Sequence, residues 1–309
     1  FRENWIFYSR YVIICNGQSG RTGRISMIKQ QKRGGYMPTT YAHYKFGKEV
    51  ISALPRPLQT SVEQNRELFD MGLHGPDLLF YYRPAMKNTV NTQGYELHDK
   101  MADIFFENAV HVIENSENPG AARAYIYGVI CHFALDSECH PYIEKMIQTS
   151  GISHSEIEME FDRLLMKEDY INPVRHLSTG HIHPSIENGE VIAPFYQDLT
   201  PQIIEKCMKS MIFYHKVLLA PGKTKRRLLF GGMKLIGAYN GMHGMVMSLE
   251  PNPECREYCR LLKRLFAGAV PLAAGLIIQY QKKLFQGGEL PSRFHRTFGA
   301  GENWEELCL

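Results

Sequence analysis

His132, Asp136 and His140 recur every four residues within the apolar segment GVICHFALDSECHPYIEKM, residues 128–146. An α-helix turns by about 100° per residue, so positions four apart lie on nearly the same face. These three side chains therefore point the same way from one predicted helix. Because burying such groups without partners costs several kcal/mol, each should be hydrogen-bonded, ion-paired or bound to a metal ion.

A second predicted helix, GISHSEIEMEFDRLL, carries His154 and Glu158 at the same spacing. Imidazole nitrogen and carboxylate oxygen both bind zinc at about 2 Å, and ligands on successive turns of one helix can reach a single ion. Such a pair alone is common on surface helices. Together with the array one helix earlier, it makes five ligand-type residues on adjacent helices, which predicts a metal site.

Three further candidate ligands precede these helices. Asp77 follows a Gly-Pro turn, His98 stands at the start of a predicted helix, and His43 lies among tyrosines. Each also has an ordinary interpretation, since Asp77 could cap its turn, His98 could cap or line its helix, and His43 could be an aromatic neighbour. His74 is a candidate substitute ligand. A separate metal site in a loop could be formed by His176, His181 and His183.

The ordered set of His43, Asp77, His98 and the two helical arrays resembles the zinc-dependent phospholipase C family. That family shares its all-helical fold and its metal site with fungal single-strand-specific zinc nucleases. The segments HFALDSECHPYI and SHSEIEMEFD look especially like the phospholipase-C-like bacterial branch. The motifs cover residues 41–162, and the rest of the chain has compatible helical character.

The resemblance implies a zinc centre of two or three ions. It assigns one ion to Asp77, His98, His132 and Asp136 and a second ion to His140, His154 and Glu158. Asp136 would also bridge towards a third ion bound by His43. Zinc ions a few Å apart would activate a shared water and neutralise charge on the phosphoryl oxygens during in-line displacement. Asp77 would act as the general base if it contacts that water.

The elements that must position these residues are predicted to be helices. From Thr40 onward the apolar residues recur mostly at intervals of three and four, so we predict an all-α chain. Pro141 disfavours helical geometry at His140, so its helix is predicted to end or kink there. Residues 176–201, rich in Gly, Pro, Ser and Asn, are predicted to be a long loop. The predicted helices cover residues 41–53, 60–71, 96–115, 119–135, 139–148, 153–168, 200–219, 223–248 and 253–286.

We predict one helical domain over residues 37–309, with a split near residues 176–200 as the alternative. Residues 1–36 show no signal-peptide pattern, and the KRGG before Met37 is what a translated ribosome-binding sequence would encode. We therefore predict that they are an upstream-encoded or cloning-derived leader without fixed structure. The most apolar stretch, residues 265–280, is shorter than a membrane span and contains Pro271, which predicts a buried, kinked helix and no transmembrane segment.

The composition is that of an ordinary globular protein. Among 309 residues, 35 are basic and 32 acidic, so the net charge of +3 demands no nucleic-acid or anionic-membrane partner. The seven cysteines form no CxxC array and are odd in number, which predicts reduced thiols and a cytoplasmic location.

The leading hypothesis is a metal-dependent phosphoric ester hydrolase, phospholipase C-like, that cleaves a phospholipid or related phosphodiester. One alternative is a single-strand nuclease of the related zinc family, in which Phe80, Tyr81 and Tyr82 would stack on bases. Another is a metal-stabilised binding protein that has kept the fold and lost turnover. The residues leave open the headgroup, the native metal, the number of ions and the oligomeric state.

Overall fold

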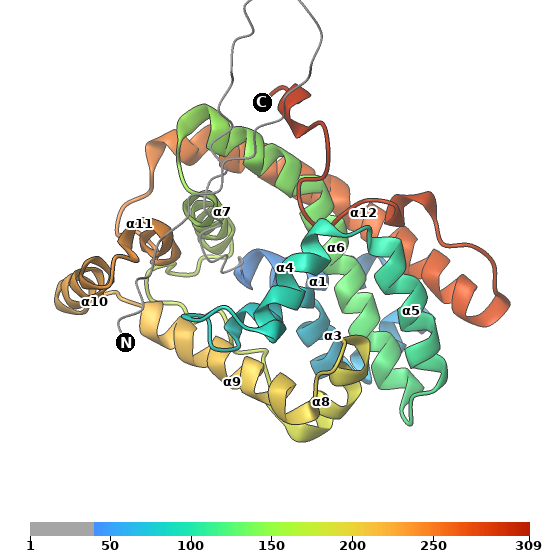
Figure 1. Ribbon diagram of the computed structural model, residues 1–309. Helices are drawn as coiled ribbons and strands as arrows, with labels where there is room; N and C mark the ends of the chain where they lie inside the picture. Colours follow the sequence, from blue (N-terminus) through green and yellow to red (C-terminus); the bar gives the residue numbers. More distant parts are fainter. Residues whose placement is uncertain (1–39) are drawn as a thin grey trace, which may run out of the picture. The chain divides into compact units, whose positions relative to one another are not determined.

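The structure, a computed structural model, describes residues 40–309, which form helices and no strand (Figure 1). The all-α prediction is therefore confirmed, and the predicted leader lies outside the described residues. The α-helices are α1 (Thr40–Ala53), α2 (Arg56–Glu63), α3 (Arg66–Gly72), α4 (Thr89–Asp99), α5 (Ala102–Glu114), α6 (Pro119–Ser150), α7 (His154–Glu168), α8 (Ile186–Ile192), α9 (Pro201–Leu218), α10 (Lys223–Leu235), α11 (Tyr239–Met242) and α12 (Arg256–Gln286). A 3₁₀ helix, η1 (Gly75–Tyr81), links α3 to α4.

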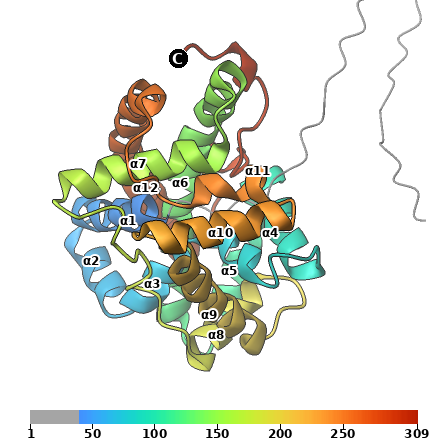
Figure 2. The ribbon, with the colours of Figure 1, turned by 90° about the vertical axis from the view of Figure 1, so that its left-hand side faces the viewer.

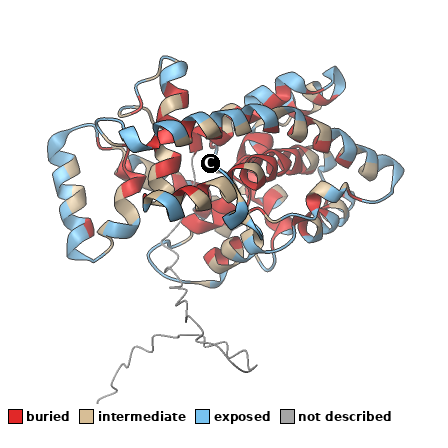
Figure 3. Cartoon of the chain, turned by 90° about the horizontal axis from the view of Figure 1, so that it is seen from above, coloured by how far each residue is buried: buried red, intermediate tan, exposed pale blue. Residues whose placement is uncertain are grey.

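Helix α6 is the element around which the others pack. It contacts α1, α3, α5, α7 and α12. Every residue from Ala124 to Ser137 is buried, so this helix is covered on all sides. Figure 3 shows buried helices at the centre, surrounded by helices that are exposed on their outer faces. The polar side chains of His132 and Asp136 therefore lie in the protein interior.

Helices α3 and α6 cross at two glycines. A Cβ atom on Gly128 would lie 2.2 Å from the carbonyl oxygen of Phe69, and one on Gly72 would lie 2.1 Å from that of Tyr125. Both distances are far below van der Waals contact with backbone atoms, so only glycine permits this approach. Because η1 follows α3 directly, the crossing brings Asp77 to the side of α6.

Replacing Gly128 with alanine is expected to lower the free energy of unfolding by about 3 kcal/mol, because the backbone of α3 must move away from the added methyl group. Urea unfolding followed by circular dichroism measures the effect. Gly120→Ala is the matched control on the same helix, since its Cβ would meet atoms no closer than 3.5 Å. Equal losses in the two variants would contradict the close crossing.

Two segments that were predicted as single helices are each divided into two helices in the structure. The segment 60–71 is divided between α2 and α3, and the segment 96–115 between α4 and α5. Helix α4 begins earlier because Asn88 and Asn91 form a capping box, each side chain accepting the backbone N–H of the other. The prediction that His98 starts a helix was therefore wrong, since His98 lies in the last turn of α4.

Two segments predicted as separate helices form the single helix α6 in the structure. Residues 119–135 and 139–148 belong to one helix that continues through Pro141, so of the two predicted alternatives at His140, an end or a kink, the end was wrong. Interior proline costs about 3 kcal/mol by removing a hydrogen bond and clashing with the preceding turn. The extensive packing of α6 outweighs that cost, and His140 stays on the same helical face as Asp136.

The segments after α7 also differ in part from the prediction. The predicted loop 176–201 contains α8, which begins where the hydroxyl of Ser185 accepts the backbone N–H of Asn188. The predicted helix 223–248 ends at Leu235, because Gly237 adopts a left-handed conformation with φ of 70°. The predictions for α1, α7, α9 and α12 agree with the structure within two or three residues.

Helix α12 contains the apolar segment 265–280 and packs against α1, α6 and α7. Within the described part of the chain, the segment Pro253–Gln286 is long and apolar enough to cross a membrane by length and composition alone. One side of the helix carries buried residues such as Phe266, Ile277 and Tyr280. A packed core helix passes the same test, so this segment is not a clear membrane span.

Candidate metal centre

Four of the predicted ligands converge beside α6. The ligand atoms of His43, Asp77, His132 and Asp136 all lie within 4.8 Å of one another, and all four side chains are buried. His132 Nε2 is 3.1 Å from one Asp136 oxygen and 3.7 Å from Asp77 Oδ2. His43 Nε2 is 3.2 Å from the other Asp136 oxygen. These residues come from α1, η1 and α6, so the tertiary structure alone brings them together.

His98 joins this first group from the end of α4. Its Nε2 atom is 3.0 Å from Asp77 Oδ1 and 3.9 Å from Asp136 Oδ2. Its ring meets the His132 ring almost at a right angle, with the centroids 6.0 Å apart. His98 therefore lies beside the carboxylates of the first group, on a different part of its helix than predicted.

A second group consists of His140, His154 and Glu158, whose ligand atoms also lie within 4.8 Å of one another. Glu158 Oε1 is 3.7 Å from His140 Nε2 and 3.1 Å from His154 Nε2. His140 Nε2 is in addition 3.8 Å from Asp136 Oδ1, so Asp136 connects the two groups. All eight residues singled out in the sequence thus form one connected cluster.

Three imidazoles of the cluster are held through Nδ1 by backbone carbonyl groups. The contacts are His132 to Leu73 at 3.2 Å, His98 to Gly94 at 2.8 Å and His140 to Phe298 at 2.9 Å. A carbonyl oxygen only accepts, so each Nδ1 carries the hydrogen. In a neutral imidazole, Nε2 then presents a lone pair. All three lone pairs face carboxylate oxygens, an arrangement that is repulsive unless a cation or a proton lies between them.

The pKa values show the same requirement for positive charge. Burial acts to lower the pKa of His140, but the carboxylates of Asp136 and Glu158 outweigh it and raise that pKa to about 10. Burial is likewise outweighed at His154, whose pKa rises to about 9 mainly because of Glu158. At His132 burial prevails and lowers the pKa to about 4, so this imidazole is neutral at physiological pH.

The residues fit zinc. Imidazole nitrogen and carboxylate oxygen are the donors that zinc takes in hydrolytic sites. Histidines that bind metal ions almost always donate their second ring N–H to a carbonyl or carboxylate, as His98, His132 and His140 do here. The cluster therefore has both the ligands and the supporting hydrogen bonds of a zinc centre.

Comparison with known proteins gives the same result. The family model described as zinc dependent phospholipase C matches residues 42–208, more than half of the chain. The chain belongs to the zinc dependent phospholipase C family. This confirms the resemblance, and the matched range contains all eight residues of the cluster and ends in α9. No curated protein and no solved structure matches the chain.

The chain beyond the part matched by the zinc dependent phospholipase C family also contributes to the centre. Phe298 is buried, with its ring centroid 5.9 Å from those of both His98 and His132. Its carbonyl oxygen accepts the hydrogen bond from His140 Nδ1, and the Gly299 N–H donates to the His98 carbonyl. No sequence signal indicates these partners, because the contacts use backbone atoms from a segment without periodicity.

Asp162 on α7 positions the start of α1. Its carboxylate accepts the backbone N–H groups of Tyr41 at 3.2 Å and Ala42 at 2.8 Å, two donors without a partner inside the helix. Burial raises the pKa of this carboxyl to about 7, against the opposing effect of the two donors. The contact fixes the first turn of α1 and hence the position of His43.

Replacing Asp162 with alanine is expected to lower the free energy of unfolding by about 2 kcal/mol, because it leaves buried N–H donors without a partner. Urea unfolding at constant zinc content measures this loss. Asp169→Ala is the matched control, since Asp169 contacts Tyr41 and Lys45 through their side chains in a partly exposed position. A loss no larger than that of the control would disprove the capping role.

The remaining histidines form a different arrangement. His74 Nε2 lies 2.7 Å from His181 Nε2, and the His181 ring also stacks on Tyr44. Burial lowers the pKa of both imidazoles, so one neutral ring donates its N–H to the other. His176 packs edge-on against a tyrosine and His183 is exposed. Within residues 40–309 these loop histidines form no group of three ligands, and His74 enters neither metal-binding group.

Proposed function

We propose that this protein is a zinc-dependent phosphodiesterase that hydrolyses a phospholipid in the manner of phospholipase C. The observation that carries the proposal is the set of Nδ1-anchored imidazoles whose Nε2 atoms face shared carboxylates. In this proposal Asp77, His98, His132 and Asp136 hold one zinc ion and His140, His154 and Glu158 hold a second. His43 and Asp136 form the side of the centre at which a third ion would bind.

The reaction is divided between the metal ions and the protein. Bound zinc would supply Lewis acidity, which lowers the pKa of a water molecule and neutralises charge on the phosphoryl oxygens. Asp77 Oδ1 is 3.0 Å from His98, whereas its Oδ2 is 3.7 Å from the nearest imidazole nitrogen, that of His132. Oδ2 is therefore the better placed atom to accept a proton from the attacking water.

The aromatic residues near the centre favour a lipid over a nucleic acid. Base stacking requires an aromatic face that is open to solvent. Phe80 and Tyr81 are buried, and the Phe80 ring is covered by Tyr95 at a centroid distance of 4.4 Å. Cations of Arg83 and Lys206 lie over the Tyr82 ring. Of these rings, Phe80 lies beside His98 at a centroid distance of 5.4 Å, and the three rings offer no uncovered platform for bases.

A direct assay compares substrates on zinc-loaded and zinc-stripped protein. Phosphatidylcholine and phosphatidylglycerol vesicles are tested beside single-stranded DNA, with mass spectrometry of the products. We expect diacylglycerol and a phosphorylated headgroup from the zinc-loaded protein only. Nucleotide release without lipid cleavage would favour the related nuclease activity, and complete zinc occupancy without turnover on any of these substrates would favour the binding protein.

A further inference from the structure

Helix α10 carries apolar residues that no other part of the described chain covers. It lies at the edge of the protein, at the left of Figure 1 and at the front of Figure 2. The exposed fractions are 73% for Leu228, 88% for Leu235 and 74% for Ile236. Leu228 and Leu235 are two helical turns apart on one face, and Gly231 and Gly232 lie between them. We call Leu228, Leu235 and Ile236 the apolar strip.

Contacts on the inner side of α10 keep the apolar strip facing away from the protein. The Arg226 side chain donates to the carbonyl oxygens of Ala220 and Met247 at 3.0 and 2.6 Å. Met233 is buried in a small cluster that includes Leu218 and Met245. These contacts fix the rotation of the helix, so the apolar strip cannot turn inward without breaking them. An apolar surface held in this way indicates an interaction site.

The charges of α10 are all of one sign. The helix contains five basic residues and no acidic residue. Lys225 and Arg226 donate to backbone carbonyls of the chain, whereas Lys223, Arg227 and Lys234 are exposed. A short helix with an exposed apolar face and basic flanks is typical of segments that lie in the interface of an anionic membrane.

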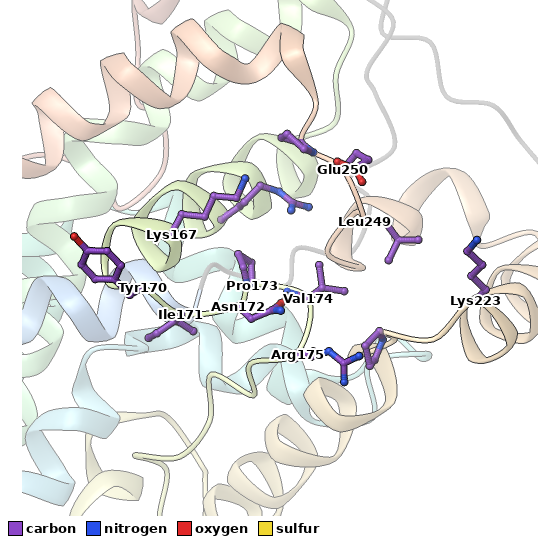
Figure 4. Close-up of a pocket in the computed structure, with 13 residues that line it drawn as sticks. Lys167, Tyr170, Ile171, Asn172, Pro173, Val174, Arg175, Lys223, Leu249 and Glu250 are labelled. Carbon is purple, nitrogen blue, oxygen red and sulfur yellow. Dashed lines mark hydrogen bonds between the residues drawn. The ribbon is translucent and has the colours of Figure 1, made fainter.

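A basic pocket adjoins the start of α10 (Figure 4). This open pocket of about 700 Å³ lies between α7, the segment after it and the first residue of α10. Lys167, Arg175 and Lys223 line it, with Glu250 as an acidic member. Arg163 also lines it but is already paired with Glu160. The positive surface therefore continues from α10 to a recess in which a phosphate headgroup would be attracted.

We propose that α10 and the basic pocket form a face that docks on anionic phospholipid membranes. Leu228, Leu235 and Ile236 enter the region between headgroups and acyl chains, while the exposed cations of α10 contact lipid phosphates. A second copy of the chain is a poorer occupant, because pairing two such faces would bring together the exposed cations of Lys223, Arg227 and Lys234 from both copies. The docking requires no turnover, so it goes beyond the proposed hydrolysis and stands independently of it.

Flotation of the full-length protein with vesicles tests the docking. Vesicles of phosphatidylcholine alone are compared with vesicles that also contain phosphatidylglycerol, with zinc-stripped protein to prevent hydrolysis. We expect binding to the anionic vesicles that weakens as salt is added. The triple variant Leu228→Ser, Leu235→Ser, Ile236→Ser should bind at least about tenfold more weakly, since three inserted side chains are lost.

Matched control variants distinguish docking by this face from non-specific adsorption to membranes. Ile104→Ser with Phe285→Ser removes side chains that are 58% and 64% exposed on α5 and α12, and it should leave binding unchanged. Arg227→Glu with Lys234→Glu should abolish the preference for anionic vesicles, whereas Lys282→Glu with Arg256→Glu should not. Unaltered vesicle binding by the triple variant would overturn the proposal. The proposal would also be overturned if the triple variant bound vesicles as before and differed only in losing a dimer in sedimentation.

Discussion

Replacing Asp136 with asparagine is expected to reduce turnover by about three orders of magnitude or more, because several kcal/mol of metal-dependent stabilisation are lost. Asp136 is the residue that connects the cluster. One oxygen lies near His43 and His140 and the other near His132 and His98. The imidazoles of His132, His140 and His43 lower the pKa of this carboxyl well below its usual range despite its burial, so it stays an anion within the centre.

Two measurements distinguish this effect from simple unfolding. Elemental analysis of Asp136→Asn should show at least one zinc ion fewer per chain, while circular dichroism should keep its helical signal. Asp103→Asn should leave zinc content and turnover unchanged, since within residues 40–309 this carboxylate of α5 contacts His295 and its own helix. Full zinc occupancy in Asp136→Asn would contradict the role assigned to this residue.

Zinc binding at the second group is expected to release about two protons per ion at neutral pH, because zinc takes only neutral imidazole. Without metal, His140 and His154 have pKa values of about 10 and 9, so both are protonated at pH 7. Two displaced protons imply that the affinity for zinc rises about a hundredfold per pH unit below pH 9. Calorimetric titration of the stripped protein in buffers of different ionisation enthalpy measures this number.

The same pKa values determine how stability depends on pH. In the metal-free protein the raised pKa values of His140 and His154 contribute stability below the unfolded value of 6.5, and this contribution is lost as the pH rises through 9 to 10. Glu158, with its pKa lowered to about 2, contributes above 4.5 and loses that contribution towards pH 2. The difference in melting temperature between zinc-loaded and stripped protein should therefore grow from pH 6 to pH 9.

Matched variants test these expectations. His154→Gln should remove about one of the released protons and weaken zinc binding, because it removes one protonated ligand. His111→Gln is the control, since His111 is exposed on α5 and faces Glu114 of the same helix. Zinc binding that releases no protons, or a melting difference that shrinks with rising pH, would refute the assignment of His140 and His154 as ligands.

The sequence was informative wherever chemistry and helix periodicity coincide. The spacing of His132, Asp136 and His140, and of His154 and Glu158, follows from the geometry of one helix, so a common face could be predicted from the chain alone. The apolar period of three and four predicted the helical class and most of the long helices. Both signals are local, which is why they can be read without knowing the fold.

The wrong predictions of helix boundaries at α4 and α6 also have identifiable causes. The capping box at Asn88 uses asparagine in place of glutamate, so the true start of α4 was overlooked and His98 was assigned to the wrong helix end. Pro141 led to the prediction of a helix end or kink, because helix propensity describes an isolated segment. In the folded protein, packing on several sides of α6 outweighs the lost hydrogen bond.

By itself the sequence determined the helical class, the eight ligand-type side chains and their pairing along two helices. Only the tertiary structure decided that α1, η1 and α4 bring His43, Asp77 and His98 to those helices, and that Phe298 supports His140. It also decided that the apolar strip of α10 faces outward. The physical reason is that these outcomes depend on close packing and on backbone hydrogen bonds between distant segments, which no local pattern of side chains encodes.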